Sequence, residues 1–288
     1  MSETINRRPY ELGLALSGGG AKGFAHLGVF KLLEECGIKP DIISGTSAGA
    51  LAGVFYADGY TSDEIKEIFK GKEFSEFACI QMPKAGLFDM SRMKGFLQKH
   101  IRAKKIENLE IPLIIIATNL DQGISHEFRH GSITEAVMAS CCVPIIFSPV
   151  EINGIHYVDG GLFHNFPVTN IRKECEKVIG VNVSPLTPLK YKQTLLYIAE
   201  RSYHYMFRAN TIADRSLCDI LIEAESVGEY KMFDLENVDQ IAQIGYNTAL
   251  HAFDHIIQDN KFEQLVKAVK QKRNETSGSQ EQMSDLLS

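Results

Sequence analysis

One serine stands in a context that favours nucleophilic chemistry. Ser47 is the centre of a Gly-x-Ser-x-Gly pentapeptide, flanked by the β-branched pair Ile42-Ile43 and by a small-residue segment, Ala50 to Ala57, that is predicted to be helical. Such a turn between a strand and a helix is a nucleophile elbow, which lifts the serine hydroxyl clear of the backbone. Gly45 and Gly49 omit the Cβ atoms that would clash with the neighbouring strand or helix. The pattern predicts that Ser47 attacks an acyl carbon.

A glycine motif precedes the elbow. Gly18-Gly19-Gly20-Ala21-Lys22-Gly23 fits Gly-x-Gly-x-x-Gly between a predicted strand and helix, as in a dinucleotide-binding fold. The acidic residue expected after the second strand is missing, and Phe24 after Gly23 does not fit a Walker A loop. The alternative is an oxyanion hole, in which the backbone N–H groups of Gly18, Gly19 and Gly20 stabilise a tetrahedral intermediate. Acyl transfer explains both motifs, so the sequence favours the oxyanion hole.

A serine nucleophile needs a proton acceptor, and the sequence offers two kinds. Asp159 ends a predicted strand before Gly160 and Gly161, where burial would raise its pKa and its basicity. A direct Ser47–Asp159 dyad is one interpretation, and a simple Asp159-Gly160 turn is the other. A Ser–Asp–His triad would instead use one of four later histidines, none of which follows a recognisable late strand: His164, His204, His251 and His255. His26, next to the glycine turn, is expected to pack in the first helix.

Strands and helices alternate along the chain, which predicts an α/β fold with helices on both faces of a mostly parallel central sheet. Val150 to Val158 is predicted to form a hairpin about Asn153-Gly154. Residues 71–92 are expected to form a loop packed on its own apolar side chains, with a flap over the site as the alternative. Further strands are predicted at 12–16, 113–118, 178–183 and 220–224, and helices at 21–36, 62–69, 93–101, 133–139, 194–214, 238–257 and 261–270.

Composition narrows the class of protein. The chain has 288 residues and a net charge of −6, which argues against a general nucleic-acid binder and against electrostatic anchoring on an anionic bilayer. Its polar N-terminus shows no secretory signal, and its six cysteines include no Cys-x-x-Cys pair. We therefore expect a reduced, cytoplasmic protein with neither a structural zinc site nor a disulfide framework.

The motifs together resemble the patatin-like phospholipases from Leu12 to about Val183. The resemblance is carried by the glycine turn, the Gly-x-Ser-x-Gly elbow and Asp159-Gly160-Gly161, in the order of the family, with a further block around Ala139-Ser140. It implies a Ser47–Asp159 dyad rather than a triad. It also implies an oxyanion hole at Gly18, Gly19 and Gly20, no metal and no cofactor, and five further motif glycines: Gly23, Gly45, Gly49, Gly160 and Gly161. Lys22 and Asn119 depart from the arginine and aspartate of many relatives.

The resemblance implies a three-layer α/β/α catalytic domain, which we place at residues 12–185. A mostly helical extension at 186–270 is expected to pack on it, and 271–288 to be disordered. The implied activity is hydrolysis of lipid acyl esters of the phospholipase A or lysophospholipase type. A lipid or acyl-ester substrate, transient contact with a membrane surface and a homodimer are the expected partners. A small-ester hydrolase, a thioesterase and an inactive lipid-binding or regulatory protein remain the alternatives.

Overall fold

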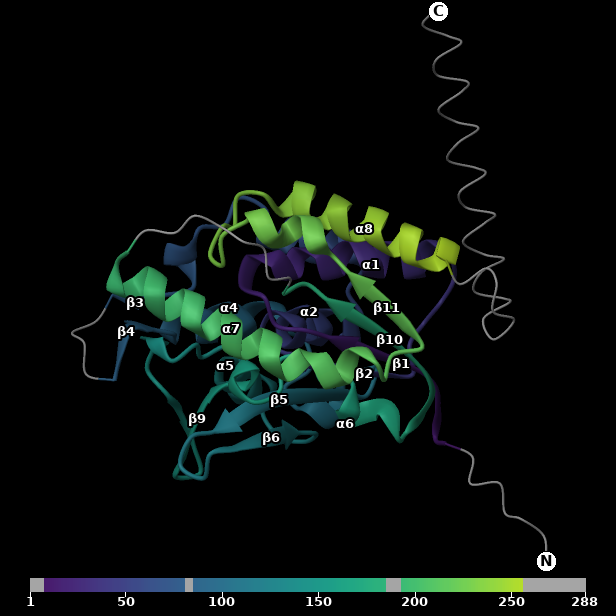
Figure 1. The fold of residues 1–288 in the computed structure, drawn as a ribbon. Helices are drawn as coiled ribbons and strands as arrows, with labels where there is room; N and C mark the ends of the chain where they lie inside the picture. Colours follow the sequence, from purple (N-terminus) through teal and green to yellow (C-terminus); the bar gives the residue numbers. More distant parts are fainter. Residues whose placement is uncertain (1–7, 81–84, 185–192, 256–288) are drawn as a thin grey trace, which may run out of the picture.

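The computed structural model describes residues 8–80, 85–184 and 193–255, which are built around one mixed sheet (Figure 1). Five parallel strands lie in the order β11-β10-β1-β2-β5, and antiparallel strands β9, β8 and β6 continue the sheet from β5. The predicted mostly parallel sheet is confirmed. Its strands are β1 (Tyr10–Leu16), β2 (Ile42–Thr46), β5 (Leu113–Asn119), β6 (Ile124–Phe128), β8 (Val150–Ile152), β9 (Ile155–Asp159), β10 (Cys175–Asn182) and β11 (Ile220–Glu223).

Helical segments cover both faces of this sheet, because alternate residues of each central strand point into different cores. Leu14 and Leu16 of β1 pack with the larger set of helices, whereas Ala15 packs with Val168 and Ile171 around α6. The predicted three-layer α/β/α architecture is therefore confirmed. The helices are α1 (Phe24–Glu35), α2 (Ala48–Ala57), α3 (Ser62–Phe69), α4 (Ser91–His100), α5 (Ile133–Ser140), α6 (Thr169–Arg172), α7 (Leu195–Arg215) and α8 (Val238–His255), with short 3-10 turns η1 (Gly20–Gly23), η2 (Phe74–Glu76), η3 (Ile106–Asn108), η4 (Gly160–Leu162) and η5 (Glu225–Glu229).

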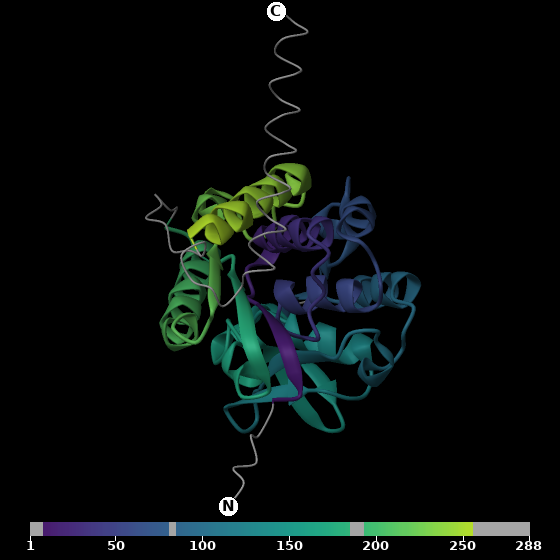
Figure 2. The same cartoon turned by 90° about the vertical axis from the view of Figure 1, so that its right-hand side faces the viewer.

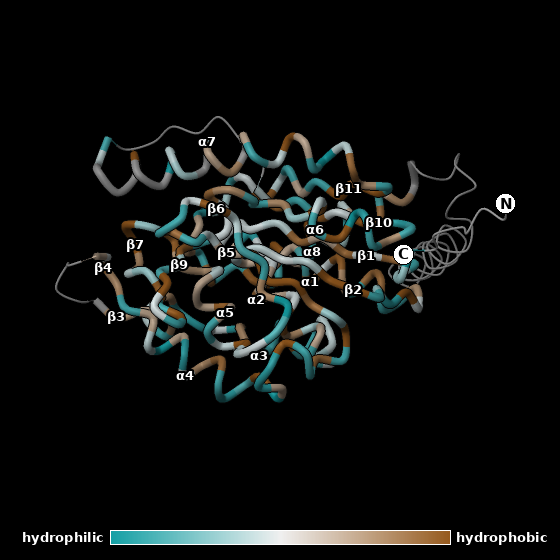
Figure 3. The backbone as a smooth tube through the Cα atoms, turned by 90° about the horizontal axis from the view of Figure 1, so that it is seen from below, coloured by the Kyte–Doolittle hydropathy of each residue, from teal (hydrophilic) through white to brown (hydrophobic). Residues whose placement is uncertain are grey.

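Hydrophobic positions gather in the central strands, and polar positions lie mostly in the peripheral loops (Figure 3). All seven residues of β5 are buried, as a strand covered on both faces requires. Strand β6 was not predicted from the sequence because its residues are half-buried or exposed and mostly polar. None of the described helices combines the length and the apolar character that a membrane span needs.

The C-terminal elements join the same body. Strand β11 pairs with β10 in the central sheet, and α8 lies against α1 in both views (Figure 2). Helices α1 and α8 approach closely at two glycines, since a Cβ on Gly28 would lie 1.9 Å from the Ala242 carbonyl oxygen and one on Gly245 would lie 1.9 Å from that of Ala25. The domain boundary at residue 186 stays a prediction. The helix predicted at 261–270 and the tail at 271–288 lie outside the described residues.

The segment at 71–92 corrects one expectation. Within it, strand β4 (Gly86–Asp89) pairs with β3 (Cys79–Ile80) and with β7 (Ile145–Phe147) in a small second sheet. Phe74 and Phe77 line the pocket that holds Ser47. The segment is therefore not a loop packed only on its own side chains, because its strands pair with a distant strand and its aromatic rings form part of the pocket wall.

Candidate active site

Ser47 occupies a strained turn between β2 and α2. Its backbone has φ 51° and ψ −119°, a conformation that a non-glycine residue keeps only where the surrounding structure enforces it. A Cβ on Gly45 would lie 2.6 Å from the Gly49 carbonyl oxygen, and one on Gly49 would lie 2.3 Å from the carbonyl oxygen of Leu16. The elbow geometry predicted from the sequence is confirmed, and only glycine fits at positions 45 and 49, two residues before and two residues after Ser47.

Ser140 stabilises this turn from the end of α5. Its hydroxyl accepts the Ser47 N–H at 2.8 Å and donates to the Ile116 carbonyl at 2.6 Å, and Ser140 is fully buried. No role for Ser140 was predicted from the sequence, although it lies in the fourth block of the family resemblance. Its contacts span from residue 140 to residues 47 and 116, so no local pattern reveals them.

Asp159 lies at the end of β9 with no exposed surface. Its Oδ1 accepts the Gly161 N–H at 2.8 Å, whereas Oδ2 has no hydrogen-bond partner among the described residues. Burial raises the pKa of Asp159 from 3.8 to about 7, and interactions with the Ser47 side chain and the Gly161 N–H act in the opposite direction. Near neutral pH this carboxylate can therefore take up a proton and release it, as a general base must.

Ser47 and Asp159 line one pocket, and its remaining wall is almost entirely apolar. No Lys, Arg or His side chain of the described residues lines it. A pocket of this kind suits an aliphatic chain whose carbonyl lies at Ser47. Representative wall residues come from segments far apart in the sequence: Leu27, Ala52, Phe69, Met93, Phe207 and Phe233.

The glycine turn is placed beside Ser47, but one of its predicted donors is already engaged. The Gly18 N–H donates to the Asn165 carbonyl at 3.0 Å, so it is not available to an oxyanion, and this part of the prediction is corrected. Gly20 lines the pocket, and the N–H groups of Gly19 and Gly20 have no hydrogen-bond partner in the described part of the chain. Met232 anchors the glycine turn, because its carbonyl accepts the Ala21 N–H at 2.7 Å.

The other motif glycines mark close contacts. A Cβ on Gly160 would lie 2.4 Å from the Ile116 carbonyl oxygen, and one on Gly161 would lie 2.1 Å from the Phe207 ring. A Cβ on Gly23 would lie 2.6 Å from the Cβ of Ala48. The absence of a side chain at Gly23 therefore lets the glycine turn pack closely against the start of α2. The structure thus brings all three motifs together around the pocket.

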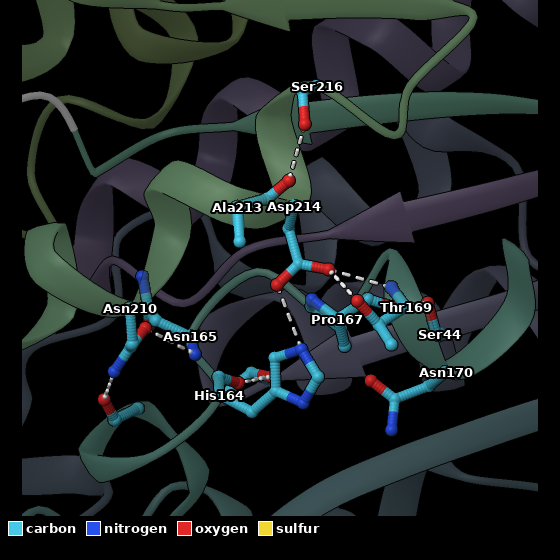
Figure 4. A network of polar contacts seen from close by, with 12 residues as sticks. Ser44, His164, Asn165, Pro167, Thr169, Asn170, Asn210, Ala213, Asp214 and Ser216 are labelled. Carbon is cyan, nitrogen blue, oxygen red and sulfur yellow. Dashed lines mark hydrogen bonds and ion pairs between the residues drawn. The ribbon is translucent and has the colours of Figure 1, made fainter.

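The histidines considered as a base are placed elsewhere. The Nε2 atom of His164 lies 2.9 Å from Asp214 Oδ2, in a network with Thr169 and α7 (Figure 4). His26 is fully buried, its Nε2 lies 2.9 Å from the Ser17 carbonyl, and burial lowers its pKa to about 4. His251 is exposed, and the side chains of His204 and His255 lie outside the described ones. The expected packing of His26 is confirmed.

Neither of the two departures from the family pattern lines the pocket. Asn119 closes the turn after β5, because its side chain accepts the Gln122 N–H at 3.0 Å and donates to the Gln122 side chain at 3.1 Å. Lys22 is buried in η1 and does not line the pocket.

The sequence is similar to proteins named as lysophospholipases, to a patatin-like phospholipase domain-containing protein and to an uncharacterised Bacillus protein. It is 31% identical over 194 residues to "Lysophospholipase NTE1" of Kluyveromyces lactis, a match that covers 64% of this chain and 14% of that protein. It is 24% identical over 293 residues to "Patatin-like phospholipase domain-containing protein 7" of Rattus norvegicus, covering 88% of this chain and 21% of that protein. It is 30% identical over 203 residues to "Uncharacterized protein YqhO" of Bacillus subtilis, covering 59% of this chain and 70% of that protein.

The chain therefore spans about a seventh of the length of the Kluyveromyces protein and about a fifth of the rat protein. The family model described as "Patatin-like phospholipase" matches residues 14–171, which is more than half of the chain. This range holds the glycine turn, the elbow, Ser140 and Asp159. By this match and by its motifs, the chain belongs to the patatin-like phospholipase family.

Proposed function

We propose that the protein hydrolyses carboxylic esters of lipids, with Ser47 as nucleophile and Asp159 as general base. The observation that carries the proposal is that these two side chains share one apolar pocket, in which burial raises the Asp159 pKa to about 7. The names of the relatives, which include a lysophospholipase, support a lipid substrate. The proposed substrate class is a phospholipid, a lysophospholipid or another lipid acyl ester.

The reaction begins when the Ser47 hydroxyl attacks the acyl carbonyl and its proton passes to Asp159. The N–H groups of Gly19 and Gly20 stabilise the oxyanion, where the loss of one donor costs on the order of 10²–10³ in rate. The tetrahedral intermediate collapses, and the alcohol leaves with the proton from Asp159. Water then attacks the acyl-enzyme, again with Asp159 as base, and the carboxylic acid is released together with free Ser47.

The two parts of a lipid substrate are expected to lie in different places relative to the pocket. An acyl chain fits the apolar wall, whereas a charged headgroup finds no cationic side chain there and lies outside the pocket. None of the six cysteines, all of which lie in the described residues, forms a disulfide, which supports the reduced, cytoplasmic location that we propose. Transient contact with a membrane surface and a homodimer remain part of the proposal.

A fluorophosphonate probe, which labels activated serines, tests the proposal on the full chain. Labelling of the wild-type protein and turnover of a p-nitrophenyl acyl ester are expected, and both are lost in Ser47→Ala. A folded wild-type protein that is neither labelled nor active would favour the inactive lipid-binding alternative. A lipid panel read out by mass spectrometry, with thioester and short-ester substrates included, then assigns the substrate class.

Two further variants distinguish the dyad from a triad. Asp159→Asn removes the proposed base and should lose nearly all turnover while keeping the fold. His164→Ala breaks the contact with Asp214 but should retain most of the turnover, since the His164 side chain contacts Asp214 and does not line the pocket. Loss of turnover in His164→Ala alone, with activity kept in Asp159→Asn, contradicts the dyad.

A further inference from the structure

The loop at 160–169 contacts all three parts of the proposed active site. The Gly161 N–H donates to Asp159, and the His164 carbonyl accepts the hydroxyl of Thr46, the residue before Ser47, at 2.8 Å. The Asn165 carbonyl accepts the Gly18 N–H at 3.0 Å. The position of this loop therefore sets the positions of the base, the elbow and the glycine turn relative to one another.

Asn210, on α7, holds the loop at two points (Figure 4). Its Nδ2 donates to the Gly161 carbonyl at 2.8 Å and more weakly to the Leu162 carbonyl at 3.3 Å. Its Oδ1 accepts the Asn165 N–H at 3.0 Å. The side-chain amide of Asn210 thus donates to Gly161 and accepts from Asn165. These are the two loop residues that contact Asp159 and Gly18, respectively.

We propose that Asn210 is a positioning residue that couples the Asp159 base to the glycine turn. The chain of contacts runs from Asp159 through Gly161 to Asn210, and from Asn210 through Asn165 to Gly18. Asn210 lies beyond residues 14–171, the range matched by the family model. The catalytic role of this coupling rests on the proposed hydrolase function, but the coupling itself can be measured without turnover.

A second anchor on the same helix makes a comparison possible. The carboxylate of Asp214 accepts the Thr169 N–H at 2.7 Å and its hydroxyl at 2.6 Å, and it contacts His164. No hydrogen bond of Asp214 within the described residues reaches Gly161 or Asn165. Asp214→Asn therefore weakens the attachment of α7 to the loop without touching the contacts that Asn210 makes.

The ionisation of Asp159 reports on the coupling. If Gly161 is no longer held by Asn210, its N–H bonds the carboxylate less well, and the pKa of Asp159 rises. The titratable groups around Asp159 are the thiols of Cys141 and Cys142 and the phenol of Tyr203 on α7. Burial raises the pKa of all three, so they stay uncharged near neutral pH and do not obscure this titration.

The experiment compares Asn210→Ala, the isosteric Asn210→Asp and Asp214→Asn with the wild-type full chain. Carboxyl-carbon NMR of protein labelled at aspartate measures the pKa of Asp159, assigned with Asp159→Asn. Ester turnover gives kcat and KM, and thermal unfolding gives Tm. Asn247→Ala serves as the matched control, since this α8 side chain is exposed and its one hydrogen bond in the described part of the chain is accepted from Gln243.

The expected result for Asn210→Ala is a higher Asp159 pKa and a kcat lower by roughly tenfold to a hundredfold, with little change in KM. Asn210→Asp keeps the shape and the acceptor but loses the donor, so its kcat falls as well. Asp214→Asn lowers Tm and leaves the Asp159 pKa near the wild-type value, and Asn247→Ala changes none of these quantities.

An unchanged Asp159 pKa and kcat in folded Asn210→Ala overturns the proposal. So does an equal pKa shift in Asp214→Asn, because α7 would then act only as a structural support. If the wild-type protein shows no ester hydrolysis at all, the proposed function fails, but the NMR titration still decides whether Asn210 couples to Asp159. If Asn210→Ala does not fold, the kcat of Asn210→Asp decides, and a wild-type value refutes the coupling.

Discussion

The backbone N–H of Ser47 donates to the Ser140 hydroxyl at 2.8 Å, so the strained elbow is held by a side chain from another helix. In Ser140→Ala this buried N–H loses its partner, at a cost of about 1–3 kcal/mol. We expect a lower Tm and a lower kcat, measured by thermal unfolding and ester turnover. Ser216→Ala is the matched control, because Ser216 is exposed and its hydroxyl donates to the Ala213 carbonyl near the end of α7. Equal Tm and kcat in the two variants would refute a supporting role for Ser140.

The rate of hydrolysis should depend on the protonation of Asp159. A general base acts only when deprotonated, and burial raises the Asp159 pKa to about 7. We therefore expect kcat/KM to rise with pH up to about 7 and then to level off, as measured with a neutral p-nitrophenyl ester. A profile that is already flat from pH 5 upward contradicts either the buried state of Asp159 or its role as base.

The same carboxylate should make the protein less stable as pH rises. The folded-state pKa of Asp159, about 7, lies above its unfolded value near 3.8, so between these two values the folded protein binds the proton more tightly than the unfolded chain. The stabilising contribution of the protonated acid is complete below pH 3.8, declines by roughly 1.4 kcal/mol per pH unit as pH rises, and is lost above pH 7.

Asp159→Asn cannot ionise and should escape this loss. Its free energy of unfolding should therefore exceed that of the wild-type protein by more at pH 8 than at pH 5, a difference measured by urea titration at both values. A difference that does not change with pH would place the Asp159 pKa near its ordinary value.

Chain-length preference should respond to Ala52. This buried residue of α2 lines the pocket about one and a half helical turns beyond Ser47. Ala52→Phe fills that space, so we expect kcat/KM for a p-nitrophenyl palmitate to fall by about tenfold or more. The butyrate ester, measured on the same variant, is the internal control and should be affected much less. An equal loss on both esters would indicate misfolding or an acyl chain bound elsewhere.

The elbow and the central strands could be predicted from local chemistry: glycines at a tight turn, or a continuous apolar run such as Leu113–Asn119. The residues alone left Asp159 as either a base or a simple turn, and its pairing with Ser47 was predicted through the family resemblance. The engagement of the Gly18 N–H could not be predicted, because its partner is a carbonyl at residue 165. The contacts of Asn210 could not be predicted either. In the sequence, a polar residue of an amphipathic helix cannot be distinguished from a solvent-exposed position, and its contact with the loop at 160–169 depends on the tertiary fold.

The segment at 71–92 was harder to interpret for a related reason. Its phenylalanines are spaced without a clear period, so they indicate neither a strand nor a helix. In the folded protein they pack against aromatic rings from distant parts of the sequence. The ring centroids of Phe74 and Phe233, for example, are 4.7 Å apart. A pocket wall assembled from distant segments leaves little trace in any one of them.

The contact between Ala21 and Met232 has a consequence for biosynthesis. The glycine turn is translated early, yet the carbonyl that accepts its Ala21 N–H belongs to Met232, far downstream in the sequence. Because the ribosome releases the protein from its N-terminus, this anchor of the turn is missing until Met232 emerges. The nascent chain therefore carries Ser47, the glycine turn and Asp159 before the turn is fully held, and we expect the proposed oxyanion hole to be complete only after Met232 has been translated.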